Sequence, residues 1–231
     1  MTFRLLYLFA FLAFASCKSD KNERIADEPT PAEPELTTAE KIAKAHGYDN
    51  WQHVNTINFT FNVDRGGDNK RPGRAWAWAP QPDAVQFFGE DETIAYTRAS
   101  MDSTKLKTDQ AFINDKYWLL VPFQLVWDNT ATLSEPVTKE APISKTEMNM
   151  ITITYPSEGG YTPGDAYDIF YDDDYMIREW VFRKGNAEEP SMMTTFENYK
   201  NYNGIMIATE HKMPDSDFNL YFDKINVTLN K

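Results

Sequence analysis

Residues 114–128, NDKYWLLVPFQLVWD, differ from the β-strand patterns that surround them in the sequence. Apolar side chains fill this segment without the alternation expected of a strand with one buried and one exposed face. Pro122 has no N–H to give to a central sheet ladder, but it can begin a helical turn. Asn114 or Asp115 can cap such a turn. We therefore expect one or two short buried helical turns, a plug or lid near residues 115–128, with a β scaffold curved around them.

The chain on both sides of this plug has the pattern of β-strands. In residues 54–63 apolar side chains alternate with polar ones, which indicates a strand with one wet face. Further strands are expected at residues 75–79, 84–89, 93–98, 147–155, 167–171, 175–183, 192–199, 205–212 and 218–229. The last of these changes its apolar parity near Asp223 and Lys224, which indicates a bulge. About ten antiparallel strands are too many for a flat sheet, so we expect a mostly β fold, a curved antiparallel meander that forms an open β-barrel.

Three other segments complete the expected domain. Thr37 and Glu40 fit a capping box and Gly47 can end a helix, so a short amphipathic N-terminal helix is expected over residues 37–47. Residues 101–111 are expected to form a polar helical turn that leads into the plug. Residues 130–145 contain Pro136 and Pro142, which discourage regular strand pairing, and are expected to form a loop.

The N-terminus has the pattern of an export signal. Arg4 is the positive charge, residues 5–14 are the apolar region, and small residues precede Cys17. Ten or so apolar residues are too few for a membrane-spanning helix, which takes roughly 20. Residues 14–17, FASC, resemble the lipobox of bacterial lipoproteins, in which the cysteine is lipidated and becomes the mature N-terminus; Phe14 departs from the preferred Leu. We expect residues 1–16 to be a lipoprotein signal peptide and Cys17 to attach the protein to a membrane.

The segment after Cys17 separates this anchor from the domain. Residues 18–36 are charged, contain prolines and have few apolar side chains, so they are expected to be a disordered spacer. Residues 17–36 would then be the lipidated cysteine and its tether, and residues 37–231 one folded domain. Several acyl chains hold a protein stably at a bilayer, whereas a single chain holds it marginally.

Charge and motifs exclude several kinds of function. The formal net charge of −12 argues against binding nucleic acid and against simple electrostatic docking on anionic lipid. Cys17 is the only cysteine, so neither an intramolecular disulfide nor a cysteine-based zinc site is possible. His46, His53 and His211 are scattered and match no metal motif, and no Walker, dinucleotide or nucleophile-elbow pattern occurs. No metal, cofactor or nucleic acid is expected.

Two clusters of side chains remain as candidates for function. The acidic cluster is either an exposed hairpin turn or a carboxylate pair of a hydrolase, which would leave no local signature; it lacks the glycine and glutamate of a calcium loop. It comprises Asp165, Asp168, Asp172, Asp173 and Asp174. The aromatic set either fills the core or lines a groove for an acyl chain or another apolar ligand. It comprises Trp76, Trp78, Trp118, Phe123, Trp127, Phe170, Trp180 and Phe182. In the second case, Trp118, Phe123 and Trp127 would form part of the lid or floor of the groove.

Two pairs of motifs carry a family resemblance. The closing hairpin, FENY at residues 196–199 and YNGI at 202–205, together with the export signal, the helix and the interrupted meander, resembles the LolA/LolB-like superfamily of Gram-negative envelope proteins. YWLLVPF at residues 117–123 and YTPGDAY at 161–167 look like a group of lipoproteins of that general shape. The resemblance covers residues 37–231 and depends on strand and turn signatures.

The resemblance implies an unclosed β-barrel whose concave side, covered by helices, holds the acyl chains of a lipoprotein in transit. It places the protein in the Gram-negative cell envelope, with the outer membrane favoured and the domain in the periplasm or at the cell surface. It implies that an apolar small molecule, an acyl chain or a lipidated partner is bound without catalysis. The alternative is a filled barrel that serves as a structural or interaction module. A cavity of about 300 Å³ or more, lined by the aromatic set, would favour ligand binding over a filled core.

Overall fold

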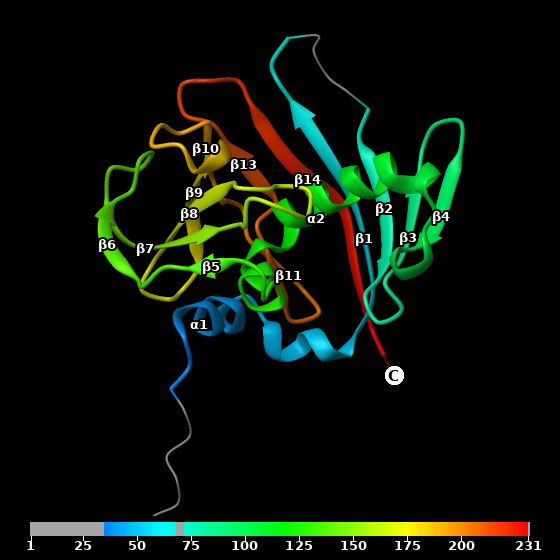
Figure 1. Ribbon diagram of the computed structural model, residues 1–231, viewed down its shortest axis with the longest axis horizontal. Coiled ribbons are helices and arrows are strands. Elements are labelled where there is room, and N and C mark those ends of the chain that lie inside the picture. Colours follow the sequence, from blue (N-terminus) through cyan, green and yellow to red (C-terminus); the bar gives the residue numbers. More distant parts are fainter. Residues whose placement is uncertain (1–34, 68–71, 231) are drawn as a thin grey trace, which may run out of the picture. The chain divides into compact units, whose positions relative to one another are not determined.

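Two antiparallel sheets with a long helix between them make up the part of the chain that the structure describes (Figure 1). The structure is a computed structural model, and it describes residues 35–67 and 72–230. The predicted signal peptide, Cys17 and the tether up to residue 34 lie outside the described residues. Leu36–Lys231 form one compact unit.

The first sheet has the strand order β13-β14-β1-β2-β3-β4. Its strands are β1 (Val54–Asp64), β2 (Arg74–Ala79), β3 (Ala84–Phe88), β4 (Thr93–Thr97), β13 (Glu210–Lys212) and β14 (Asn219–Leu229). Between β1 and β14 the register shifts after the pair Asn58 and Asn226, so that Thr60 faces Asp223. Lys224, next to this point, has a positive φ of 49°. The bulge predicted near Asp223 and Lys224 is confirmed.

The second sheet has the order β10-β9-β8-β7-β5, and β6 also pairs with β7. Its strands are β5 (Thr132–Leu133), β6 (Val137–Glu140), β7 (Glu147–Thr154), β8 (Ala166–Tyr171), β9 (Ile177–Arg183) and β10 (Met192–Thr195). A small hairpin, β11 (Lys200–Tyr202) and β12 (Ile205–Ile207), stands apart from both sheets. Across the described strands neither sheet closes on itself, so the predicted mostly β, open antiparallel fold is confirmed.

The prediction of a loop over residues 130–145 was wrong. β5 and β6 both lie in this segment, and they pair with different parts of β7. Pro136 falls between the two strands and Pro142 falls after the second, so neither proline removes a donor from a ladder.

The N-terminal helix α1 (Thr38–Ala45) is confirmed. Its capping box is complete, because Glu40 N–H donates to Thr37 Oγ1 at 3.3 Å and Thr37 N–H donates to Glu40 Oε2 at 2.7 Å. Gly47 follows with a φ of 93°, a conformation that favours glycine, and a 3-10 helix, η1 (Tyr48–His53), leads into β1.

Helix α2 (Leu106–Trp127) is longer than the sequence predicted. The expected polar turn and the expected plug form one helix, preceded by two 3-10 turns, η2 (Arg98–Ser100) and η3 (Ser103–Lys105). The helix kinks at Leu120, where φ is −128° and ψ is 27°, two residues before Pro122. Its N-terminal half carries Asp109 and Asp115, which are fully buried and paired with arginines. A polar segment can therefore be buried as a regular helix.

Helix α2 packs against both sheets, as expected of a plug inside a β shell. One face, with Phe112 and Phe123, joins a core cluster with Trp76 and other inward side chains of the first sheet. Another face, with Val121 and Leu125, joins a cluster with the second sheet and α1. In the described ranges no helix is long and apolar enough to cross a membrane.

Candidate functional site

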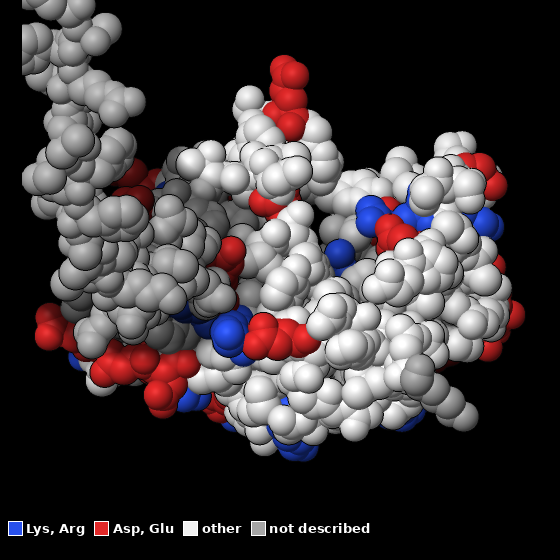
Figure 2. All heavy atoms as spheres, turned by 90° about the horizontal axis from the view of Figure 1, so that it is seen from below, with Lys and Arg blue, Asp and Glu red and all other residues white. Residues whose placement is uncertain are grey.

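A cavity of about 1110 Å³ lies between α2, the second sheet and the loop of residues 155–165, which connects β7 to β8. Seen from below, the molecule is hollowed on one side, and basic side chains lie inside this hollow and at its edge (Figure 2). The volume is well above the roughly 300 Å³ at which pockets for small molecules begin. The space between α2 and the second sheet is therefore not completely filled by side chains.

One wall of the cavity is aromatic. Side chains of β8 and β9 meet side chains of α2 here. Tyr167 of β8 pairs with Phe182 of β9, and Trp180 lies two residues before Phe182 on the same face of the sheet. Trp118 of α2 lies against Trp180 with 4.2 Å between ring centroids. The aromatic residues that line the cavity are Tyr117, Trp118, Tyr155, Tyr161, Tyr167, Trp180 and Phe182. Tyr167 and Trp180 are themselves buried, whereas the other five are partly exposed and offer surface that an apolar ligand can bury.

The lining also includes two basic side chains, Arg98 and Lys116, and three acidic ones, Asp128, Glu158 and Asp165. Arg98 is paired, because its Nε donates to Asp109 Oδ1 at 2.8 Å and its Nη1 lies 3.2 Å from Asp83 Oδ2. Lys116 forms no ion pair with any described residue. Burial, together with the charge of Arg98, lowers the pKa of Lys116 to about 8. The cavity is therefore amphipathic, with an aromatic wall and side chains of both charges in its lining.

The loop of residues 155–165 is tied to α2 by a buried carboxylate. Tyr161 Oη donates to Asp109 Oδ2 at 2.7 Å, and Tyr96 Oη donates to the other oxygen at 3.1 Å. Tyr155 Oη donates to Tyr117 Oη at 3.2 Å and attaches the start of the loop to the same helix. These bonds hold the loop in place as one side of the cavity.

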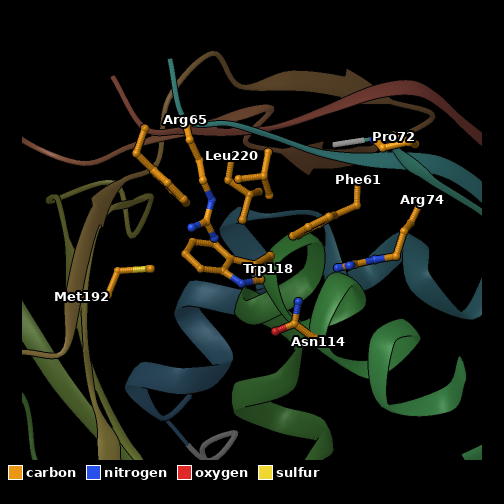
Figure 3. A pocket seen from close by; sticks show the side chains of 10 residues that line it. Phe61, Arg65, Pro72, Arg74, Asn114, Trp118, Met192 and Leu220 are labelled. Carbon is orange, nitrogen blue, oxygen red and sulfur yellow. The ribbon is translucent and has the colours of Figure 1, made fainter. Parts of the chain in front are cut away.

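A second cavity of about 250 Å³ lies on the other side of Trp118. Trp118, Asn114 and Met192 line both cavities, so the two spaces are neighbours. Arg65 points towards Trp118 here, and Arg74 points in from the opposite side (Figure 3).

The structure brings three of the eight predicted aromatic residues to the large cavity: Trp118, Trp180 and Phe182. The other five line neither of the two cavities. Trp76, Trp78 and Phe123 belong to the first core cluster, Trp127 packs at its edge, and Phe170 lies in a small separate cluster with Met150 and Val181.

Sequence reasoning missed the tyrosines and Lys116. Tyr155 and Tyr167 stand in predicted strands, but a strand pattern does not say which inward side chains border an empty space. The sequence does contain a signal that points to Lys116, because it is the one basic residue inside the apolar segment 114–128. A cation in such a segment needs a partner or a function.

The acidic cluster is divided among separate contacts. Asp168 is paired with Arg183 at 3.0 Å, and Asp172 accepts a hydrogen bond from Arg178 Nε at 2.7 Å. Asp173 and Asp174 lie in the turn between β8 and β9, and Asp165 is the member that lines the cavity. Within residues 35–67 and 72–230 no three His, Cys, Asp or Glu side chains are placed to hold a metal ion.

Comparison with known proteins gives matches to solved structures. No protein-family model and no curated protein matches the sequence. The chain is similar to LolA-like structures. A LolA superfamily protein from Nitrosomonas europaea aligns with a TM-score of 0.44 at 10% identity, over 85% of this chain and 96% of that one. A DUF1329 family protein from Desulfovibrio piger aligns with a TM-score of 0.43 at 9% identity, over 84% of this chain and 93% of that one.

A third similar structure is a putative outer membrane lipoprotein-sorting protein domain from Vibrio parahaemolyticus. It has a TM-score of 0.37 at 8% identity and covers 82% of this chain and 93% of its own. The resemblance to LolA-like proteins predicted from the sequence is thus found again among solved structures.

Proposed function

We propose that this domain binds an apolar ligand, or the acyl chains of a lipidated partner, in the cavity between α2 and the second sheet, and that it does so without catalysis. The observation that supports the proposal is a space of about 1110 Å³ with an aromatic wall. A filled barrel acting only as an interaction module would have no use for such a space. The predicted export signal and the lipobox-like Cys17 support a location at a membrane, and the resemblance to LolA-like proteins suggests the Gram-negative cell envelope.

Burial of apolar surface would drive the binding. Each Å² of apolar surface removed from water contributes about 25 cal/mol, from which the costs of association are subtracted. Trp118, Trp180 and Phe182 are held by ring contacts with their neighbours, so the wall is formed before the ligand arrives. A preformed site loses little conformational entropy on binding.

A larger side chain in the cavity should weaken ligand binding. Met192 of β10 lines both cavities, so we expect Met192→Trp to reduce the space in them and to lower the amount of bound lipid about tenfold, or roughly 1.4 kcal/mol. The measurement is mass spectrometry of lipids that co-purify with the gently extracted full-length protein, per mole of protein.

Met193 supplies the matched control. It is the next residue of the same strand, and it packs against the cluster of Phe170 and Val181 rather than the cavity. Met193→Trp should therefore leave the bound lipid unchanged. Equal lipid in the native protein and in Met192→Trp, with both folded by circular dichroism, would refute binding in this cavity.

The anchor is tested separately. We expect Cys17→Ala to move the exported protein from the membrane fraction to the soluble fraction, because the acyl chains are its only proposed attachment. Fractionation and immunoblotting of cells that express each form measure this. Continued membrane association of the exported variant would show that the attachment does not depend on Cys17.

A further inference from the structure

Lys116 stands in the cavity without a carboxylate partner. Its Nζ lies 5.1 Å from the ring centroid of Trp78 and 5.5 Å from that of Trp127, so aromatic faces give it partial compensation. No described carboxylate lies within ion-pair distance of it. Since its pKa is held at about 8, the side chain is still mostly protonated at neutral pH. The protein therefore keeps a positive charge over the rings of Trp78 and Trp127, with no ion-pair partner among the described residues, in a cavity that the aromatic wall also lines.

Three carboxylates, Asp83, Asp109 and Asp128, act on Lys116 through their charge, and each already binds other groups. Asp83 and Asp109 are both bound to Arg98, at 3.2 and 2.8 Å. Asp128 accepts from the backbone N–H of Thr130 at 2.9 Å, and from the Thr130 hydroxyl and the Gln124 side chain. The protein uses each of these acids elsewhere. Asp128, Glu158 and Asp165 also line the cavity, but none of them lies within ion-pair distance of Lys116, so a ligand carboxylate can take that place.

We propose that the ligand is an amphiphile with an anionic head of carboxylate type, and that Lys116 binds this head while the aromatic wall takes the tail. This inference rests on the proposed function of the cavity. Lys116 and the next two residues of α2, Tyr117 and Trp118, all line the same space. A head held at Lys116 leaves the tail in the space that Trp118 and Phe182 also line. Pairing a partly desolvated ammonium with a carboxylate is among the stronger hydrogen-bonded contacts in proteins.

Photo-crosslinking of the full-length protein in membranes tests the inference. The probes are a diazirine-bearing long-chain fatty acid and its methyl ester, which share the tail and differ in head charge. At about neutral pH we expect the acid to label cavity-lining peptides about tenfold more than the ester, as an ion pair of moderate strength allows. In Lys116→Met this preference should disappear while ester labelling stays. Lys116→Arg should keep it, because the charge is kept.

Lys107 supplies the control, because it lies on the same helix but is exposed. Lys107→Met should leave the preference for the acid unchanged. Equal labelling by acid and ester in the native protein would overturn recognition of the head while leaving apolar binding intact. An equal loss of both probes in Lys116→Met would also overturn it, because it would show that Lys116 only shapes the cavity. Absence of cavity labelling by either probe would refute the proposed function itself.

Discussion

Replacing Arg74 by Leu is expected to lower the free energy of unfolding by about 2–4 kcal/mol, because it leaves a buried carboxylate without its cation. Asp115 is fully buried on α2, and Arg74 Nε donates to its Oδ2 at 2.7 Å. Without Arg74, only Trp76 Nε1 at 2.9 Å and the Asn114 side chain at 3.0 Å remain as donors. The side chain of Arg74 is 38% exposed, so the loss should stay below that of a fully buried pair. Urea unfolding of the purified full-length chain, followed by tryptophan fluorescence, measures it.

Two comparisons identify the cause of this loss. Arg178→Leu makes the same substitution in a more exposed ion pair, between Arg178 and Asp172, and should lower the free energy of unfolding by about 1 kcal/mol or less.

The pH dependence is the second comparison. Desolvation raises the pKa of Asp115, and loss of Arg74 should raise that pKa further. The carboxyl then takes up a proton in the folded state, so the cost of Arg74→Leu should shrink towards acidic pH. A loss below about 0.5 kcal/mol at neutral pH would show that the pair does not support α2.

Lowering the pH from about 7.5 to about 5 is expected to destabilise the domain by about 2–4 kcal/mol, because two buried histidines stay neutral in the folded state. Burial lowers the pKa of His46 to about 4 and that of His211 to about 3. In the unfolded chain both titrate near their ordinary value of about 6.5. Below that pH the unfolded state binds protons that the folded state cannot, so stability falls as the pH falls. Denaturant unfolding at a series of pH values gives the slope.

His211→Leu should reduce that slope by about half, because one of the two groups no longer titrates. His211 suits the test, since its Nδ1 lies 3.2 Å from the carbonyl oxygen of Thr195 while its buried Nε2 has no partner among the described residues. His53→Asn is the control at an exposed position and should leave the slope unchanged. If His211→Leu and the native protein lost stability equally between these pH values, this assignment would be wrong.

Local patterns predicted most of the regular elements. The alternation in β1, the capping box of α1 and the parity change in β14 each depend on neighbouring residues, and each was confirmed. The length of α2 could not be predicted in this way. Asp115 finds its cation on β2, 41 residues earlier, and Asp109 finds one just after β4. Without those partners, a polar segment looks like an exposed turn rather than half of a buried helix.

Composition and local pattern determined by themselves that this chain forms a mostly β domain with an aromatic-rich interior and an inserted helical segment. The tertiary structure alone decided which aromatic residues border empty space and which fill the core. Phe170 and Phe182 have the same chemistry, yet one is buried beside Met150 and Val181 and the other is partly exposed and lines the cavity. The difference follows from long-range packing and ion pairs, which no short stretch of sequence contains.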